Sequence, residues 1–318
     1  MSETQSTPEH DGAVLSPDEV FSILSDDTRL GIVRALWRAD AMRTFDDVDE
    51  TAVTLPYSDL RERVGIEDNG KFNYHLSKLR PYFVRKSGAG YRLSGAGKRI
   101  ARTVVAVSGP HSGVRQEVDV DCPLCGGTVD GSYEDAWLRF TCTECAGLFG
   151  DTAPDGTLLN ENFPPAGVSP DDVATAYRAK LYRCVLDMLY LMQGICRECA
   201  SPIRTSVTVC TDHAAGSDPC AACGHHSEAW ATLQCPTCRF AKRLPVEFCT
   251  LGLLPTLSFL YEHGINLFDP SLEQLVGVVE TRFELAVRDD PRRFDVTVGF
   301  ADETLSLTLD EDLAIVGQ

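Results

Sequence analysis

Long apolar runs are absent from this sequence of 318 residues. A membrane-spanning helix needs about 18 or more consecutive apolar residues, and the most apolar stretch, 185–195, is shorter and contains Asp187. The first 13 residues are polar and acidic, without the basic and apolar segments of a secretion signal. We therefore expect a soluble, cytoplasmic protein that has no membrane partner and folds into two or three domains.

Catalytic motifs are also missing. The sequence contains no phosphate-binding loop, no nucleophile elbow and no His-Glu zinc motif with an open coordination position. We expect a protein that is not an enzyme. A hydrolytic or redox role for one of the cysteine pairs described below is the alternative within the enzyme class.

Positive charge is scarce. The chain has 29 Lys and Arg against 47 Asp and Glu, a net charge of −18, and only six of the basic residues are Lys. This composition resembles that of proteins from salt-loving archaea, whose acidic surfaces stay hydrated in concentrated salt. The acidity then reflects the solvent and does not exclude a nucleic-acid partner.

One segment departs from this acidity. Residues 56–105 contain 11 basic and 4 acidic residues, a net charge of +7. A basic stretch inside an acidic chain is the footprint expected of a surface that binds phosphates. Chance clustering of charge is the alternative.

The same segment lies in a region with a characteristic order of elements. Ser16-Pro17 begins a first helix, and a second helix follows from Ser25. A short helix over 58–64 is followed by a turn at Asn69-Gly70, a helix over 71–79, a β-hairpin over 83–93 and a last helix capped by Ser94. This order is typical of a winged helix-turn-helix domain, which we place at residues 15–108.

These motifs resemble a known family. The segment LSDDTRLGIVRAL from Leu24 resembles the opening helix of ArsR-type regulators, and GKFNYHLSKLR from Gly70 with FVRKSGAGYRLSGAGKRI from Phe83 resembles the recognition helix, wing and last helix of their haloarchaeal members. The resemblance covers residues 16–107 well and the whole chain more loosely. It implies a sequence-specific transcriptional regulator that binds double-stranded DNA as a homodimer, with half-sites about 34 Å apart.

The family's metal sensing does not carry over to this domain. ArsR-type sensors place Cys or His ligands in the helix before the recognition helix or in the last helix. The corresponding segments here, DLRERVGI from Asp59 and GAGKRIARTVVAV from Gly95, contain neither residue type.

The residues themselves predict a DNA-reading face. Phe72, Leu76 and Leu79 share one side of the helix over 71–79, so its polar side chains point the other way, and basic residues flank the Gly-rich hairpin tip. An ordinary solvated helix and hairpin is the alternative, and His75, at the edge of the apolar face, is expected to be a packing residue. The predicted DNA contacts are Lys71, Asn73, Tyr74, Ser77, Lys78, Arg80, Arg85, Lys86 and Arg92.

Cysteine, in contrast, is abundant. Thirteen cysteines in a cytosolic chain favour metal ligands over disulfides. The pairs Cys122/Cys125 and Cys142/Cys145 have the spacing of a zinc ribbon, which we place at 117–165. Free thiols or a redox pair are the alternative.

Each such pair of ligands, including the two above, is called a hook here. A second cysteine-rich region has four more hooks: Cys196/Cys199, Cys210/His213, Cys220/Cys223 and Cys235/Cys238. Consecutive hooks sharing a metal is the simplest arrangement, and an interleaved cross-brace is the alternative. Cys210/His213 is the weakest hook, because His225 or His226 can replace His213 or the site can be vacant. We expect two zinc ions in the chain and a third if this hook contributes. Four protein ligands leave no position for water, so the zinc is expected to be structural.

The remaining sequence suggests an α+β fold. We expect a disordered tail over 1–14, a long helix from Ser169-Pro170 to about Met192 inside a second zinc-binding region over 168–245, and a C-terminal region over 246–318 with a helix over 252–262 and an antiparallel meander over 282–317. Cys184 and Cys249 are left outside the hooks, and Cys184 is expected to be a buried thiol.

Function beyond the first domain is open at this point. The zinc region and meander are expected to bind a partner, sense an effector or support oligomerisation, and the helices over 95–107 and 170–192 are candidate dimer faces. The alternative function is a zinc-ribbon adaptor that docks on RNA polymerase or RNA, with the winged helix making protein contacts.

Overall fold

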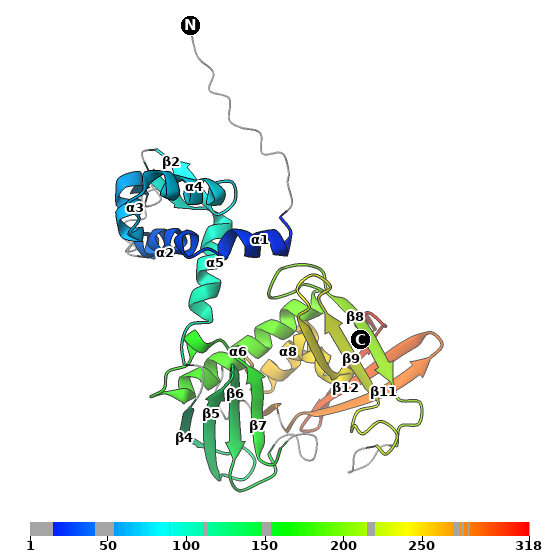
Figure 1. Ribbon diagram of the computed structural model, residues 1–318. Helices are drawn as coiled ribbons and strands as arrows, with labels where there is room; N and C mark the ends of the chain where they lie inside the picture. The colour runs from blue at the N-terminus through cyan, green and yellow to red at the C-terminus, as the bar shows by residue number, and fades with distance from the viewer. Residues whose placement is uncertain are drawn as a thin grey trace. The chain divides into compact units, whose positions relative to one another are not determined.

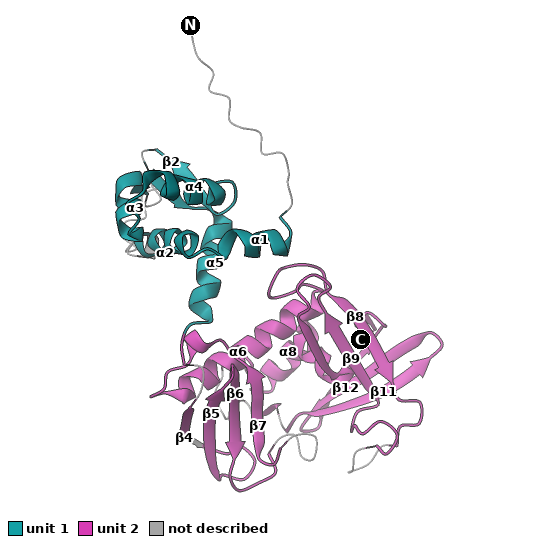
Figure 2. Ribbon diagram, viewed as in Figure 1, with its two compact units in different colours: residues 1–108 teal, residues 109–318 magenta. Residues whose placement is uncertain are grey.

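The computed structural model describes residues 15–41, 54–88, 90–110, 113–147, 154–214, 220–269, 274, 277–278 and 280–317. The expected tail over 1–14 lies outside the described residues. The fold is α+β, as the sequence predicts, with four antiparallel sheets and several helices (Figure 1). The chain divides into two compact units, residues 1–108 and 109–318 (Figure 2), which are described separately.

Unit 1 consists of helices around a small antiparallel sheet with strand order β1-β3-β2. The last two strands form a hairpin, in which Val84 faces Leu93. The elements are α1 (Pro17–Leu24), α2 (Asp27–Ala41), β1 (Leu55–Pro56), α3 (Tyr57–Val64), α4 (Asn69–Leu79), β2 (Val84–Ser87), β3 (Gly90–Leu93) and α5 (Gly95–Ala106).

Side-chain caps set the helix starts in unit 1. Ser16 caps α1, because its hydroxyl accepts a bond from the Glu19 amide at 3.3 Å and the Glu19 carboxylate accepts the Ser16 amide at 2.8 Å. Ser94 caps α5, because its hydroxyl accepts a bond from the Gly97 amide at 3.1 Å. The turn predicted at Asn69-Gly70 is wrong: the Asp68 carboxylate accepts the Lys71 amide at 2.9 Å, so α4 already begins at Asn69.

The core of unit 1 forms beneath α4. Phe72, Leu76 and Leu79 are each 0% exposed and pack with residues from α2, α3 and the hairpin. Burying three such side chains contributes several kcal/mol, at about 1.5–3 kcal/mol each. Gly97 allows α5 to lie close to the hairpin, since a Cβ there would approach the Phe83 carbonyl oxygen to 2.2 Å. The core therefore fixes which side of α4 faces outward.

Unit 2 begins with a four-stranded meander that one face of α6 covers (Figure 1). Its inner side chains include Tyr133, Leu138 and Phe140, which pack against the first half of α6. The elements are β4 (Val114–Asp121), β5 (Thr128–Glu134), β6 (Trp137–Cys142), β7 (Thr157–Asn162), the 3-10 turn Pro165–Gly167 and α6 (Val173–Met192).

The second half of α6 packs into another core. There Leu191 meets residues of two further sheets, with strand orders β10-β9-β8 and β11-β12-β13-β14, and of the helices between them. These elements are β8 (Arg204–Val209), β9 (Ala229–Gln234), β10 (Ala241–Pro245), α7 (Val246–Cys249), the 3-10 turn Thr250–Gly252, α8 (Leu254–Glu262), β11 (Arg282–Asp289), β12 (Arg292–Phe300), β13 (Glu303–Leu309) and β14 (Ile315–Gly317).

Two details differ from the sequence prediction. The long helix starts at Val173 and not at Ser169-Pro170, because the Asp172 carboxylate accepts the Thr175 amide at 3.0 Å and caps it there. The predicted C-terminal helix starts at Leu254, two residues later than expected. The antiparallel meander is confirmed as β11–β14.

Buried charges join the parts of unit 2. Lys180 of α6 is 2% exposed, and its Nζ lies 3.2 Å from Glu161 Oε2 at the end of β7. Lys242 of β10 pairs with the other oxygen of the same carboxylate. Within the described residues, no helix is long and apolar enough to cross a bilayer.

Candidate metal centres and nucleic-acid interface

The first metal-compatible group lies at one end of the β4–β7 sheet. Cys122 and Cys125 occupy the turn between β4 and β5, Cys142 is the last residue of the antiparallel partner strand β6, and Cys145 follows that strand. Cys122 Sγ lies 3.7 Å from Cys145 Sγ, and Cys125 Sγ lies 3.6 Å from Cys142 Sγ. All four sulfur atoms lie within 4.8 Å of one another.

The other four hooks form two nested groups. Cys196, Cys199, Cys235 and Cys238 make one group, and Cys210, His213, Cys220 and Cys223 make the other. In the first of these, the Cys196–Cys238 and Cys199–Cys235 sulfur pairs are each 3.5 Å apart. The structure therefore brings all twelve predicted ligands into three groups of four.

The nesting overturns the expectation that consecutive hooks share a metal, and it is not the interleaved cross-brace either. Its cause is the hairpin formed by β8 and β9. Arg204 pairs with Gln234 at one end of this ladder, which brings the hook before β8 to the hook after β9. Val209 pairs with Ala229 at the other end, which brings the two middle hooks together.

Four of the hooks share one backbone turn. In each, the amide four residues after the first cysteine donates to that cysteine's carbonyl, as Gly126 does to Cys122 at 2.8 Å. The donor residue has a positive φ in every case. Two of these residues, Ala200 (φ 61°) and Arg239 (φ 65°), are not glycine, so their backbones are held in a conformation that L-residues disfavour. The turn aims both sulfur atoms of a hook at one point.

His213 completes the third group through one defined ring nitrogen. Its Nδ1 lies 3.6 Å from Cys223 Sγ, whereas its Nε2 lies 3.2 Å from the carbonyl oxygen of His226. With Nδ1 as the ligand, Nε2–H donates to that carbonyl, which fixes the tautomer and the ring orientation. His226 thus supports the site through its backbone, while the His225 ring stacks on Trp230 at 4.5 Å.

Hydrogen-bond donors favour the thiolate form of some hook cysteines, whereas desolvation and neighbouring thiols raise the pKa of others, such as Cys125 and Cys238, to about 12. The hydroxyl and amide of Ser201 lower the pKa of Cys199 to about 6. The amides of Ala214, Cys223 and Ala222 lower the pKa of Cys220 to about 6. Since the thiolate is the form that binds metal, these bonds prepare the sites for a cation.

The two cysteines outside the hooks are in a different environment. Cys249 is 0% exposed, and burial raises the pKa of its thiol to about 12. Cys184 on α6 is half-buried and not fully buried as expected, and its partial burial raises the pKa of its thiol. Both are expected to be unreactive thiols at neutral pH.

The outward face of α4 carries the predicted DNA contacts. Lys71, Asn73, Tyr74, Ser77, Lys78 and Arg80 are all exposed. Two have contacts within the helix, because the Ser77 hydroxyl donates to the Tyr74 carbonyl at 2.7 Å and Lys78 Nζ lies 5.6 Å from the centre of the Tyr74 ring. Arg61 of α3 braces the α3–α4 turn by donating to the Glu67 carbonyl at 2.6 Å.

The hairpin places two arginines side by side. Arg85 pairs with Arg92 in the β2–β3 register, and Lys86 is exposed next to Arg85. Arg92 is half-buried, and its Nε has no hydrogen-bond partner among the described residues. Like charges directly opposite each other destabilise a sheet by about 0.2–1 kcal/mol, so this pair favours an anion nearby.

His75 is a packing residue, as predicted. Its exposed fraction is 8%, and Nδ1 lies 3.2 Å from Asp26 Oδ1 at the start of α2. It therefore ties α4 to α2 and does not belong to the outward face.

The fold and sites define an α+β protein with three Cys-rich groups able to hold metal ions. Residues 119–315 match a family model described as Domain of unknown function (DUF7351), and residues 17–104 match one described as Domain of unknown function (DUF7347). The first match spans more than half of the sequence, so the chain belongs to the DUF7351 family. No curated protein and no solved structure matches.

Sequence reasoning missed some residues around the sites. Ser227 donates to the buried Glu247 carboxylate at 2.9 Å beside the third group, and Arg288 and Arg293 line a pocket in the last sheet. Their partners come from other strands and helices, so no local pattern marks them. Alternating charges on the outer face of the meander were the one available signal for the arginines.

Proposed function

We propose that the protein is a sequence-specific DNA-binding transcriptional regulator whose unit 1 is an ArsR-like winged helix-turn-helix domain. The observation that carries the proposal is α4. Its apolar side is sealed in the core by Phe72, Leu76 and Leu79, while every predicted contact on its polar side is exposed. A helix presented in this way after α3 and before a basic hairpin suits insertion into the major groove.

The side chains on α4 match the chemistry of base edges. Lys71 can donate to guanine acceptors, and Asn73 can make the paired bonds that select adenine. Lys78 and Arg80 suit phosphates, which position the helix without reading sequence. In the hairpin, Arg85 and Arg92 offer guanidinium groups whose mutual repulsion a DNA phosphate would relieve.

For unit 2 we propose three structural zinc ions, in a zinc ribbon over the first group and in the two nested groups. A tetrahedral site with zinc–sulfur bonds of 2.3 Å has sulfur–sulfur edges of about 3.8 Å. The paired sulfur atoms lie 3.5–3.7 Å apart, near this value and far from the ~2 Å of a disulfide. Each group supplies four ligands, which leaves no coordination position for a substrate.

A homodimer is part of the proposal. Unit 1 exposes large apolar side chains on its first and last helices, with Phe21 at 72% and Val104 at 53%. Val105 and Val107 at the end of the last helix are exposed as well. A two-fold dimer through these helices would bury them and would present two copies of α4 to successive half-sites.

The test is selection of DNA sequences by the full-length, zinc-loaded protein, followed by affinity measurements on the selected site. We expect a palindromic consensus. Asn73→Ala and Lys71→Ala should each weaken binding to that site by about 1–3 kcal/mol. Arg34→Ala, which removes an exposed arginine from α2, is the matched control and should leave affinity unchanged.

Two outcomes would contradict the proposal. Normal affinity of both α4 variants for the selected site would contradict the assignment of α4 as the recognition helix. Selection without any sequence preference would favour the alternative, an adaptor that docks on RNA polymerase or RNA through its zinc-binding region.

A further inference from the structure

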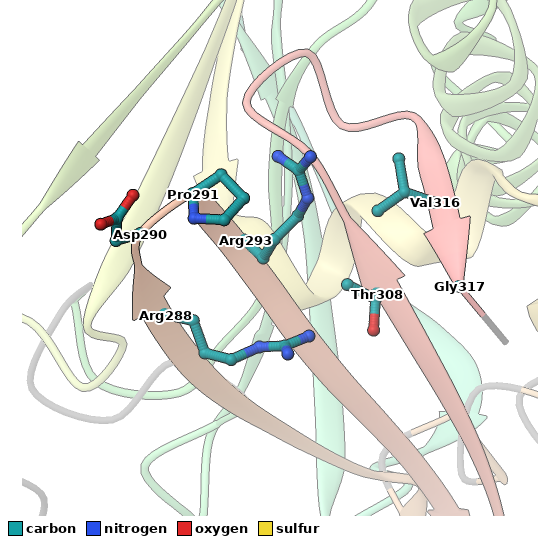
Figure 3. A pocket seen from close by; sticks show the side chains of 7 residues that line it. All are labelled: Arg288, Asp290, Pro291, Arg293, Thr308, Val316 and Gly317. Carbon is teal, nitrogen blue, oxygen red and sulfur yellow. The ribbon is translucent and has the colours of Figure 1, made fainter.

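A pocket of about 450 Å³ lies on the outer side of the last sheet, at the end where β11 turns into β12 and β14 closes the sheet (Figure 3). This volume is within the usual range for small-molecule sites, about 300–1,000 Å³. Pro291 and Val316 supply apolar wall, and Arg288, Arg293 and Thr308 supply polar groups. None of these residues belongs to the metal groups or to α4.

One of the two arginines is already neutralised. Arg288 makes a two-pronged ion pair with Asp295, in which Nε and Nη2 each lie 2.6 Å from a carboxylate oxygen. The Thr308 hydroxyl donates to the same carboxylate at 2.6 Å. Arg288, Asp295 and Thr308 therefore form a fixed, electrically neutral floor across three strands.

The other arginine, Arg293, forms no ion pair with the residues that the structure describes. Arg293 lies directly across from Arg288 in the β11–β12 register, and its Nη1 donates to the Arg292 carbonyl at 2.8 Å. Among the residues that the structure describes, no carboxylate pairs with it. Its Nε and Nη2 make no hydrogen bond to the described residues. Arg293 is half-buried, and a partly desolvated guanidinium group without a carboxylate favours an anion beside it.

The rim limits the charge of a ligand. Asp290 is exposed at the edge of the pocket, and its charge repels a dianion about twice as strongly as a monoanion. A planar carboxylate matches the guanidinium fork with two parallel hydrogen bonds. The apolar wall formed by Pro291 and Val316 suits a hydrocarbon body attached to that carboxylate.

We propose that this pocket binds a small organic monocarboxylate, with the carboxylate on Arg293 and the hydrocarbon part against Pro291 and Val316. The proposal does not depend on DNA binding, because ligand binding is measured directly on the protein. Failure of one proposal therefore leaves the other standing.

The experiment uses full-length, zinc-loaded protein and three probes that share an aromatic ring. Benzoate carries a carboxylate, phenyl phosphate carries a phosphate, and benzamide is the neutral counterpart. Binding is followed by saturation-transfer NMR titration at constant ionic strength. We expect saturable binding of benzoate, weaker binding of phenyl phosphate and no saturable binding of benzamide.

Variants locate the site. Arg293→Gln should weaken benzoate binding about tenfold, the effect of losing a charge-assisted hydrogen bond. The benzoate affinity of Arg293→Lys should lie between those of Arg293→Gln and the unaltered protein. Arg204→Gln is the matched control, since it removes an exposed arginine from another strand of unit 2, and this variant should bind benzoate as the unaltered protein does. Unchanged melting curves would show that the variants remain folded.

Three results would overturn the proposal. Equal benzoate affinity in the Arg293→Gln variant would place the binding elsewhere. Equal binding of benzamide and benzoate would show that the carboxylate charge of the ligand does not contribute to binding. Tighter binding of phenyl phosphate than of benzoate would overturn the assignment to carboxylates.

Discussion

Unit 1 and the β8–β10 sheet of unit 2 are held together in different ways. Unit 1 buries large side chains such as Ile32, Leu60 and Phe72 completely beneath its helices. In the β8–β10 sheet, β8 has no fully buried residue, and β9 buries mainly Ala229, Ala231 and Leu233. Each end of the β8–β9 hairpin carries a group of four metal ligands instead. If the proposed zinc ions are bound, coordination bonds stabilise this sheet at both ends of the hairpin, whereas unit 1 depends on its apolar core.

Removing the metal should produce the largest difference in stability between the β8–β10 sheet and unit 1. We expect a strong chelator to unfold the β8–β10 sheet while unit 1 stays folded, because a structural zinc site contributes on the order of 10–16 kcal/mol of apparent binding free energy. Hydrogen exchange resolved along the full chain measures both regions at once. Exchange in residues 204–245 should rise to that of an unfolded chain, and exchange in 69–79 should not change.

Protection of 204–245 that survives complete metal removal would contradict this dependence. Loss of protection in both regions together would also contradict it, since the two units would then share one cooperative transition.

A cavity in the core of unit 1 should destabilise unit 1 and leave the β8–β10 sheet unchanged. Phe72→Ala should destabilise unit 1 by about 3–5 kcal/mol, because Phe72 is 0% exposed and its ring packs against Tyr57 at 5.1 Å. Denaturation followed by Trp37 fluorescence, with Trp137 and Trp230 replaced by Phe, reports on unit 1 alone. Tyr74→Ala, on the exposed side of the same helix, is the control and should change stability by less than about 1 kcal/mol. A similar loss in both variants would mean that α4 is not packed on its Phe72 side.

Lowering the pH should reveal an electrostatic contribution to the stability of unit 1 that does not depend on metal. Burial raises the pKa of Asp26, but the Arg29 amide and His75 outweigh it, so the pKa lies below its ordinary value of 3.8. A lowered pKa gives stability that is present above pH 3.8 and is lost as the pH falls through the folded-state value. Asp26→Ala should therefore lower the stability of unit 1 by about 1 kcal/mol at pH 7, as loss of a cap does, and by less at pH 2.5. An equal loss at both pH values in the Trp37 assay would show that the carboxylate charge has no role.

The smallest effect concerns the hook turns. Arg239→Gly should stabilise the second metal group by about 0.5–1 kcal/mol, because glycine adopts the positive φ of 65° without steric conflict. Gly224→Ala, at the same position of another hook, should have the opposite sign. Thermal melting of the zinc-loaded protein measures both changes. Destabilisation by Arg239→Gly would mean that the arginine side chain matters more than the backbone.

Much of the site was visible in the sequence because it is local. A Cys-x-x-Cys spacing commits two ligands to one turn, and the i, i+4, i+7 spacing of Phe72, Leu76 and Leu79 commits one side of a helix to the core. Helix caps such as Ser16 and Ser94 are local too, and both mark true helix starts. The turn assigned to Asn69-Gly70 was wrong for a related reason, since the cap one residue earlier outweighs the turn tendency of that pair.

The sharing of hooks was not visible, because it depends on strand pairing. The four hooks of 196–238 have similar spacing, and only the β8–β9 ladder selects the nested arrangement. In the two segments that lie next to the outer hooks, 204–209 and 229–234, apolar and polar residues largely alternate. This alternation was a usable signal that the two segments pair as a hairpin. The pairing of Lys180 with Glu161 and the open position of Arg293 likewise depend on strands far apart in the chain.

Taken by itself, the amino-acid order determined the α+β class, the twelve metal-ligand candidates, and which side of α4 is apolar, since each follows from spacing within a few residues. Tertiary structure alone decided which hooks meet, which lysines share the Glu161 carboxylate, and that Arg293 lines a pocket in which no described carboxylate pairs with it. The physical reason is distance along the chain: periodicity fixes direction within one element, whereas contact between elements depends on how sheets pair and how cores close.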